Sequence, residues 1–135
     1  MHLSLVPDVH LPESHEDAIA KVTAALKKEG FGILTTIDIR AALKEKLGAE
    51  FRPYTILGAC NPPLAQAALT TEPRMGLMLP CNVTVEAAAD GGSIVRFANP
   101  EAMLSLGGAA TNPALSQVAA DATGRLHRAL RALTS

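Results

Sequence analysis

The sequence predicts a single compact domain that combines helices with strands, and three observations lead to this prediction. The chain has 135 residues, which is the usual size of one domain. Segments with apolar residues three or four positions apart occur between shorter segments rich in β-branched and small residues. Asn-Pro pairs and glycines separate these segments, and no repeat or linker divides them. We therefore expect one domain over residues 1–135.

The first part of the chain predicts two strands and two helices. Residues 3–11 alternate weakly between apolar and polar and predict a strand. Ser14 is a suitable N-cap for a helix that ends at Gly30, where glycine permits a left-handed turn. Residues 31–37 predict a second strand, after which the carboxylate of Asp38 can cap a second helix.

The middle of the chain predicts a strand followed by a short helix. Residues 54–60 carry apolar or small side chains on both faces, which is typical of a strand inside a sheet. The Asn-Pro-Pro sequence at 61–63 signals a helix start, because asparagine caps well and proline fits the first helical position. We expect a short helix over 64–69, compatible with a parallel crossover to the following strand.

The last part of the chain predicts a hairpin and two helices. Alternation over residues 76–86 predicts a strand, residues 90–93 a turn, and residues 94–98 the returning strand. Asn-Pro pairs then open a short helix over 99–106 and a long one over 113–133. The side chains expected to face inward on the long helix are Leu115, Val118, Ala122, Leu126, Leu130 and Leu133.

Composition and charge exclude several classes of function. Twelve basic and thirteen acidic residues give a net charge of −1, without the excess positive charge expected of a nucleic-acid binder. One tyrosine, three phenylalanines and no tryptophan offer few surfaces on which bases could stack. No apolar run approaches the roughly 18 residues of a membrane span, and the start lacks the pattern of a secretion signal. We therefore expect a cytoplasmic protein without nucleic-acid or membrane partners.

Both cysteines lie in apolar surroundings and precede asparagines. Cys60 comes directly before a helix start, where the partial positive charge of the helix can favour the thiolate. The alternative is a small residue that packs at a tight corner. Cys81 lies on the apolar face of its strand, where burial would raise the pKa of the thiol. The position of Asn61 is accounted for by its role as the N-cap of the following helix, whereas Asn82 is the better candidate for contact with a ligand.

The sequence gives little support to cofactor or metal chemistry. No glycine-rich phosphate loop is present, and Pro62 and Pro63 remove two amide donors from the helix start. The four histidines are scattered, and the cysteines lack the Cys-X-X-Cys spacing. A soft metal could bind only if Cys60 and Cys81 converge. We expect no cofactor.

Four short motifs, taken together in order and spacing, carry a family resemblance. They are Gly30-Phe31-Gly32 with Asp38, Tyr54 to Cys60-Asn61-Pro62, Leu79-Pro80-Cys81-Asn82-Val83, and Asn99-Pro100 before Met103-Leu104. Over about residues 14–106 the chain resembles the family named domain of unknown function 302. The resemblance implies an α+β fold similar to the TATA-binding-protein-like class, with a curved, mainly antiparallel sheet backed by helices. It also implies a homodimer, but no established activity. The antiparallel sheet that it implies conflicts with the parallel crossover expected after the strand at 54–60.

Our leading hypothesis is a dimeric module that binds a small ligand or protein partner near the Cys60-Asn61 corner. The dense group of polar and thiol side chains, without a general base nearby, motivates it. The first alternative is a thiol-dependent enzyme or redox protein with Cys60 as the reactive thiolate, and the second is soft-metal binding by Cys60 and Cys81. The candidate ligand-binding residues are Cys60, Asn61, Asn82, Tyr54 and Cys81.

Overall fold

Within residues 2–134 the protein folds around a five-stranded antiparallel sheet in the order β1-β5-β4-β3-β2. The structure is a computed structural model that describes residues 2–134. The strands are β1 (Val9–Leu11), β2 (Gly32–Asp38), β3 (Tyr54–Cys60), β4 (Cys81–Ala87) and β5 (Ser93–Phe97). The expected α+β class and antiparallel sheet are confirmed. The parallel crossover is wrong, because β3 and β4 are antiparallel neighbours.

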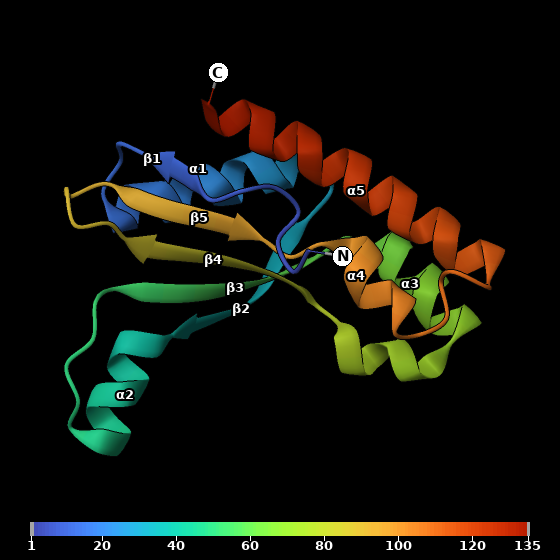
Figure 1. Ribbon diagram of the computed structural model, residues 1–135, viewed down its shortest axis with the longest axis horizontal. Coiled ribbons are helices and arrows are strands. Elements are labelled where there is room, and N and C mark those ends of the chain that lie inside the picture. Colours follow the sequence, from blue (N-terminus) through green and yellow to red (C-terminus); the bar gives the residue numbers. More distant parts are fainter. Residues whose placement is uncertain (1, 135) are drawn as a thin grey trace.

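Helices α1 (His15–Lys28) and α5 (Pro113–Thr134) cover one face of this sheet (Figure 1). Helices α3 (Pro62–Thr71) and α4 (Pro100–Ser105) and the 3₁₀ helix η1 (Pro73–Met78) lie past its end, whereas α2 (Ile39–Leu47) projects away from the sheet beyond β2. Helices α1 and α5 pack against each other and bury the main core against alternate residues of the strands, such as Leu57, Val85 and Phe97. No helix within residues 2–134 is long and apolar enough to cross a membrane.

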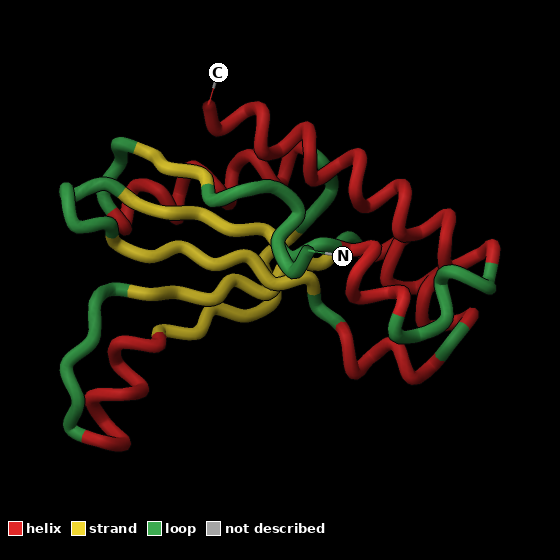
Figure 2. The backbone as a smooth tube through the Cα atoms, viewed as in Figure 1, coloured by secondary structure: helices red, strands yellow, loops and turns green. Residues whose placement is uncertain are grey.

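A second, smaller core lies beyond the end of the sheet, where α3, η1 and α4 meet the first half of α5 (Figure 2). Its buried members include Ala68, Met75, Leu104 and Leu115. The same helix, α5, also supplies Leu126 to the main core. Helix α5 therefore joins the two cores and fixes how the sheet meets α3 and α4.

The predicted helix ends are confirmed in atomic detail. The Ser14 hydroxyl accepts a hydrogen bond from the Asp17 amide at 3.3 Å. The Asp38 carboxylate accepts one from the Ala41 amide at 2.9 Å. Gly30, one residue beyond the C-cap of α1, has the positive φ of +84° that the sequence predicts for a residue ending a helix.

Two predicted strands are shorter than expected, and prolines explain both differences. In the segment 3–11 only Val9–Leu11 is a strand, although Ser4 forms an isolated bridge with Ala98. Pro7 interrupts this segment, because proline cannot donate to a ladder. Pro73 opens the 3₁₀ helix η1, and the strand predicted from residue 76 begins only after Pro80. The helix predicted over 64–69 is longer and spans Pro62–Thr71.

Candidate functional site

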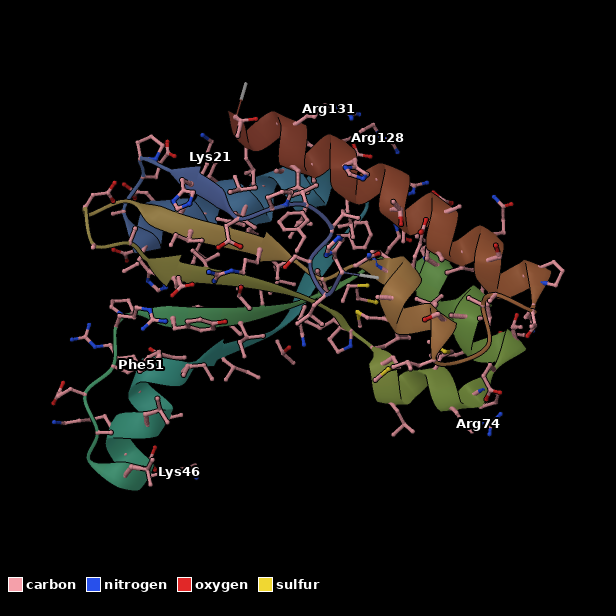
Figure 3. The ribbon with its side chains drawn as sticks, in the orientation of Figure 1. Lys21, Lys46, Phe51, Arg74, Arg128 and Arg131 are labelled. Carbon is pink, nitrogen blue, oxygen red and sulfur yellow. The ribbon has the colours of Figure 1, made fainter. Side chains whose placement is uncertain are left out.

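A cavity of about 280 Å³ lies where the ends of β3 and β4 meet α3, α4 and α5. Its apolar lining includes Phe31, Leu64, Leu104 and Val118. None of the described residues that line it carries a charged side chain. The labelled cations in Figure 3, such as Arg74 and Arg131, lie at the periphery of the molecule and do not line the cavity. The cavity therefore offers an apolar surface without a fixed charge.

Asn61 forms the corner between β3 and α3 and lies on the cavity wall. Its side-chain Oδ1 accepts a hydrogen bond from the Leu64 amide at 3.3 Å, which caps α3. Its Nδ2 donates to the Glu29 carbonyl at 3.4 Å. A Cβ atom at Gly30 would lie 2.8 Å from this Nδ2, so the turn after α1 can approach only because residue 30 is glycine. Both ends of the Asn61 amide are thus engaged in holding the corner together.

The two cysteines lie at neighbouring positions on adjacent strands, and both line the cavity. Ala59, which precedes Cys60, pairs with Cys81 across β3 and β4. Cys60 is half-buried, whereas Cys81 is buried. Burial, with a smaller contribution from the charge of Cys60, raises the pKa of the Cys81 thiol to about 11. Cys81 therefore stays protonated at neutral pH and behaves as part of the wall.

The raised pKa of Cys81 predicts a loss of stability in alkali. In the folded chain the pKa of the Cys81 thiol is about 11, whereas the pKa of the same thiol in the unfolded chain is 9.0. The contribution of the protonated Cys81 thiol to the free energy of unfolding is therefore fully present below pH 9, and it is lost as the pH rises through about 11. This component amounts to about 3 kcal/mol of the free energy of unfolding, and urea unfolding at a series of pH values from below 9 to above 11 measures its loss. Cys81→Ala should lose this component, whereas Cys60→Ala should retain it; parallel pH curves for wild type and Cys81→Ala would contradict the assignment.

A buried carboxylate lies away from the cavity, within a network of ion pairs. Burial opposes ionisation of Glu86, but hydrogen bonds from Arg96 and Arg52 outweigh it and lower the pKa of its carboxyl group. Arg96 also binds Asp8, with Nε 2.9 Å from Oδ1. This network ties the N-terminal segment to β4 and β5, and its charges are paired with one another. Among residues 2–134 no group of three or more histidine, cysteine, aspartate or glutamate side chains could hold a metal ion.

Comparison with known proteins identifies the family. The model of the family described as domain of unknown function DUF302 matches residues 8–133. The chain belongs to the DUF302 family. It is similar to a crystal structure of an uncharacterised conserved DUF302 protein from Bacillus stearothermophilus, with 30% identity and a TM-score of 0.81. The similarity covers 93% of this chain and 95% of that one. No curated protein matches the sequence.

The DUF302 fold brings together three of the five candidate ligand-binding residues. Cys60, Asn61 and Cys81 line the cavity. Tyr54 lies at the opposite end of β3, paired with Glu86. Asn82 pairs with Gly58 and is exposed, so it lies next to the cavity wall without lining it.

Sequence reasoning missed most of the apolar wall of the cavity. Leu104 comes from α4, and Val118 and Ala122 come from α5. Each belongs to an apolar stripe that the sequence shows clearly, but a stripe indicates only that a residue faces inward. Which stripes enclose an unfilled space depends on contacts between segments that are far apart in the sequence.

Proposed function

We propose that this DUF302 protein binds a small, uncharged and largely apolar molecule in the cavity beside Cys60 and Asn61. One observation carries the proposal: the described cavity wall is apolar and has no charged side chain. The Asn61 amide is already bonded to Leu64 and Glu29. An anion or cation placed there would lose its hydration without gaining a partner, which is costly.

The size and position of the cavity support a ligand of one or two small rings that enters from solvent. An engineered apolar cavity of about 150 Å³ accommodates benzene, and this cavity has a volume of about 280 Å³. Two of its lining residues, Leu34 and Leu69, are 68% and 39% exposed, so part of the lining reaches solvent. A ligand could therefore enter past these side chains and cover apolar surface that water now contacts.

Matched neutral and anionic probes test the proposal. Indole and cyclohexanol should raise the midpoint of thermal unfolding in a concentration-dependent way, because they bind the folded state. At ten times the dissociation constant the expected stabilisation is about 1.4 kcal/mol, or a shift of roughly 4 °C. Indole-5-carboxylate and cyclohexanecarboxylate should give no shift. Failure of both neutral probes, or equal shifts from their carboxylates, would contradict the proposal.

The thiol-enzyme and soft-metal alternatives stay predictions. Both thiols line the cavity, but no described lining residue is a histidine, lysine, aspartate or glutamate that could act as a base or as a further charged ligand. Binding without chemistry needs none of these groups. The composition of the wall therefore favours the binding module.

A further inference from the structure

Two free thiols share the wall of the apolar cavity. Cys60 ends β3, Cys81 begins β4, and both residues line the cavity. The register places Cys81 opposite Ala59, the residue before Cys60, and neighbouring strands lie about 5 Å apart. The charge of Cys60 contributes to the raised pKa of Cys81, so the two sulfur atoms lie close enough to interact. A molecule in the cavity therefore meets both thiols.

The Cys81 thiol lies at the cavity without a partner. The residue is 9% exposed, and its sulfur has no hydrogen-bond partner among residues 2–134. It stays protonated at neutral pH, because burial raises the pKa of the thiol to about 11. A neutral S–H group is a weak donor, and buried donors usually have an acceptor. The unpaired Cys81 thiol is therefore available to an acceptor atom on a ligand.

Cys60 differs from Cys81 in its access to water. Cys60 is half-buried, and the wall that it shares with Leu34 reaches solvent at that side chain. Water can therefore take up the proton of the Cys60 thiol. A cysteine thiolate is a strong nucleophile, and cysteine reacts at neutral pH more readily than the other side-chain nucleophiles. Cys60 is thus suited to attack a bound molecule, and Cys81 is suited to donate a hydrogen bond to it.

The composition of the wall indicates which electrophile fits. No described lining residue is a lysine that could hold an aldehyde as an imine, and none is a general acid that could help a leaving group depart. An α,β-unsaturated ketone or aldehyde needs neither group. It is uncharged and largely apolar, its β-carbon accepts a thiolate, and its carbonyl oxygen accepts a hydrogen bond. Both atoms belong to one conjugated group, so a single ligand can face both thiols.

We propose that the cavity captures an apolar α,β-unsaturated carbonyl compound by addition of the Cys60 thiol, while the Cys81 thiol donates a hydrogen bond to the carbonyl oxygen. The Cys60 sulfur forms a bond to the β-carbon, and the carbon–carbon double bond becomes a single bond as its electron pair shifts towards the carbonyl oxygen. The α-carbon then takes a proton from water, which balances the proton that Cys60 gave up. No oxidant, reductant or leaving group takes part.

This inference rests on the proposed binding function and names a ligand class for the same site. The capture is stoichiometric, so it needs no group that releases a product. It also gives both thiols of the wall a role, whereas reversible binding of an apolar molecule uses them only as surface.

Cyclohexenone, in its conjugated form, and its saturated counterpart cyclohexanone separate capture from binding. Cyclohexanone should raise the midpoint of thermal unfolding and leave the chain mass of 14.1 kDa unchanged, whereas cyclohexenone should add its own mass once. The rate of addition should level off at high cyclohexenone concentration, because the compound binds before it reacts, and indole should slow it. With N-acetylcysteine, which has no cavity, the rate should rise in proportion to concentration.

Three variants and a digest assign the two roles. Cys60→Ala should form no adduct. Cys81→Ala should react about fivefold more slowly than the wild type, the loss expected of one hydrogen bond, and Cys81→Ser, which keeps a donor, should regain most of the rate. Trypsin cuts after Arg74, between the two cysteines, so the peptide masses of the modified wild type locate the adduct even if a variant fails to fold.

Four outcomes would overturn all or part of this account. An unchanged mass with cyclohexenone, while cyclohexanone still stabilises the chain, would refute the capture and leave the binding function standing. No response to either compound would refute both. An adduct on the peptide that contains Cys81, or a rate that never levels off and ignores indole, would place the reaction outside the proposed geometry. Equal rates for Cys81→Ala and the wild type would contradict the hydrogen bond assigned to Cys81.

Discussion

Replacing Leu126 by alanine should lower the free energy of unfolding by about 2–5 kcal/mol. Leu126 is 1% exposed and lies in the main core, on the helix that also reaches the second core. Truncating it removes apolar contacts and leaves a space that the surrounding side chains fill only partly. Because α5 joins the two cores, the loss should appear as one cooperative shift of the urea unfolding transition.

Leu106→Ala is the matched control for this substitution. Leu106 follows α4 and is 77% exposed, so the same truncation should change the free energy of unfolding by less than about 0.5 kcal/mol. Equal losses for Leu126→Ala and Leu106→Ala in urea unfolding would show that the main core does not lie where the structure places it.

Gly58→Ala should destabilise the chain by about 1–3 kcal/mol through overpacking. A Cβ atom at this position of β3 would lie 2.2 Å from Thr35 Oγ1 and 2.8 Å from Pro80 Cγ. Both neighbours would have to shift, and Pro80 itself lines the cavity. We therefore expect a lower midpoint of urea unfolding for Gly58→Ala.

Two further variants make this prediction specific. Gly76→Ala adds the same methyl group where the nearest atom, Leu69 Cδ2, is 3.7 Å away, and it should be nearly neutral. Adding Thr35→Ala to Gly58→Ala should recover part of the loss, because it removes the nearer obstacle while Pro80 remains. A neutral Gly58→Ala, or no recovery in the double variant, would argue against this packing.

Local signals in the sequence predicted most helix boundaries and several strands. The caps at Ser14, Asp38 and Asn61 were predictable because an N-cap acts on amides two or three residues away. The two faces of β3 were predictable because side chains alternate along a strand, and Leu57 and Ala59 are buried as that alternation requires. The family resemblance supplied the antiparallel sheet.

Features that depend on distant segments were not predictable in this way. The pairing of β3 with β4 brings Ala59 next to Cys81, and nothing in either local pattern sets that register. Clean alternation extended the β4 prediction too far towards the N-terminus, because the helical turns opened by Pro73 override it. The cavity itself depends on how α5 crosses both cores, which no local pattern shows. The sequence could therefore identify Asn82 as polar and exposed, but it could not show where Asn82 lies relative to the cavity wall.

Calorimetric titration with indole tests most directly whether the cavity is a binding site. Ala65 and Ala67 lie on the same helix, α3, but only Ala65 lines the cavity, whereas Ala67 is exposed. The wild-type chain and Ala67→Phe should bind indole equally, and Ala65→Phe should bind it at least about tenfold more weakly, because the added ring occupies the cavity. Unchanged binding by Ala65→Phe, or no binding by the wild-type chain, would contradict the proposed function.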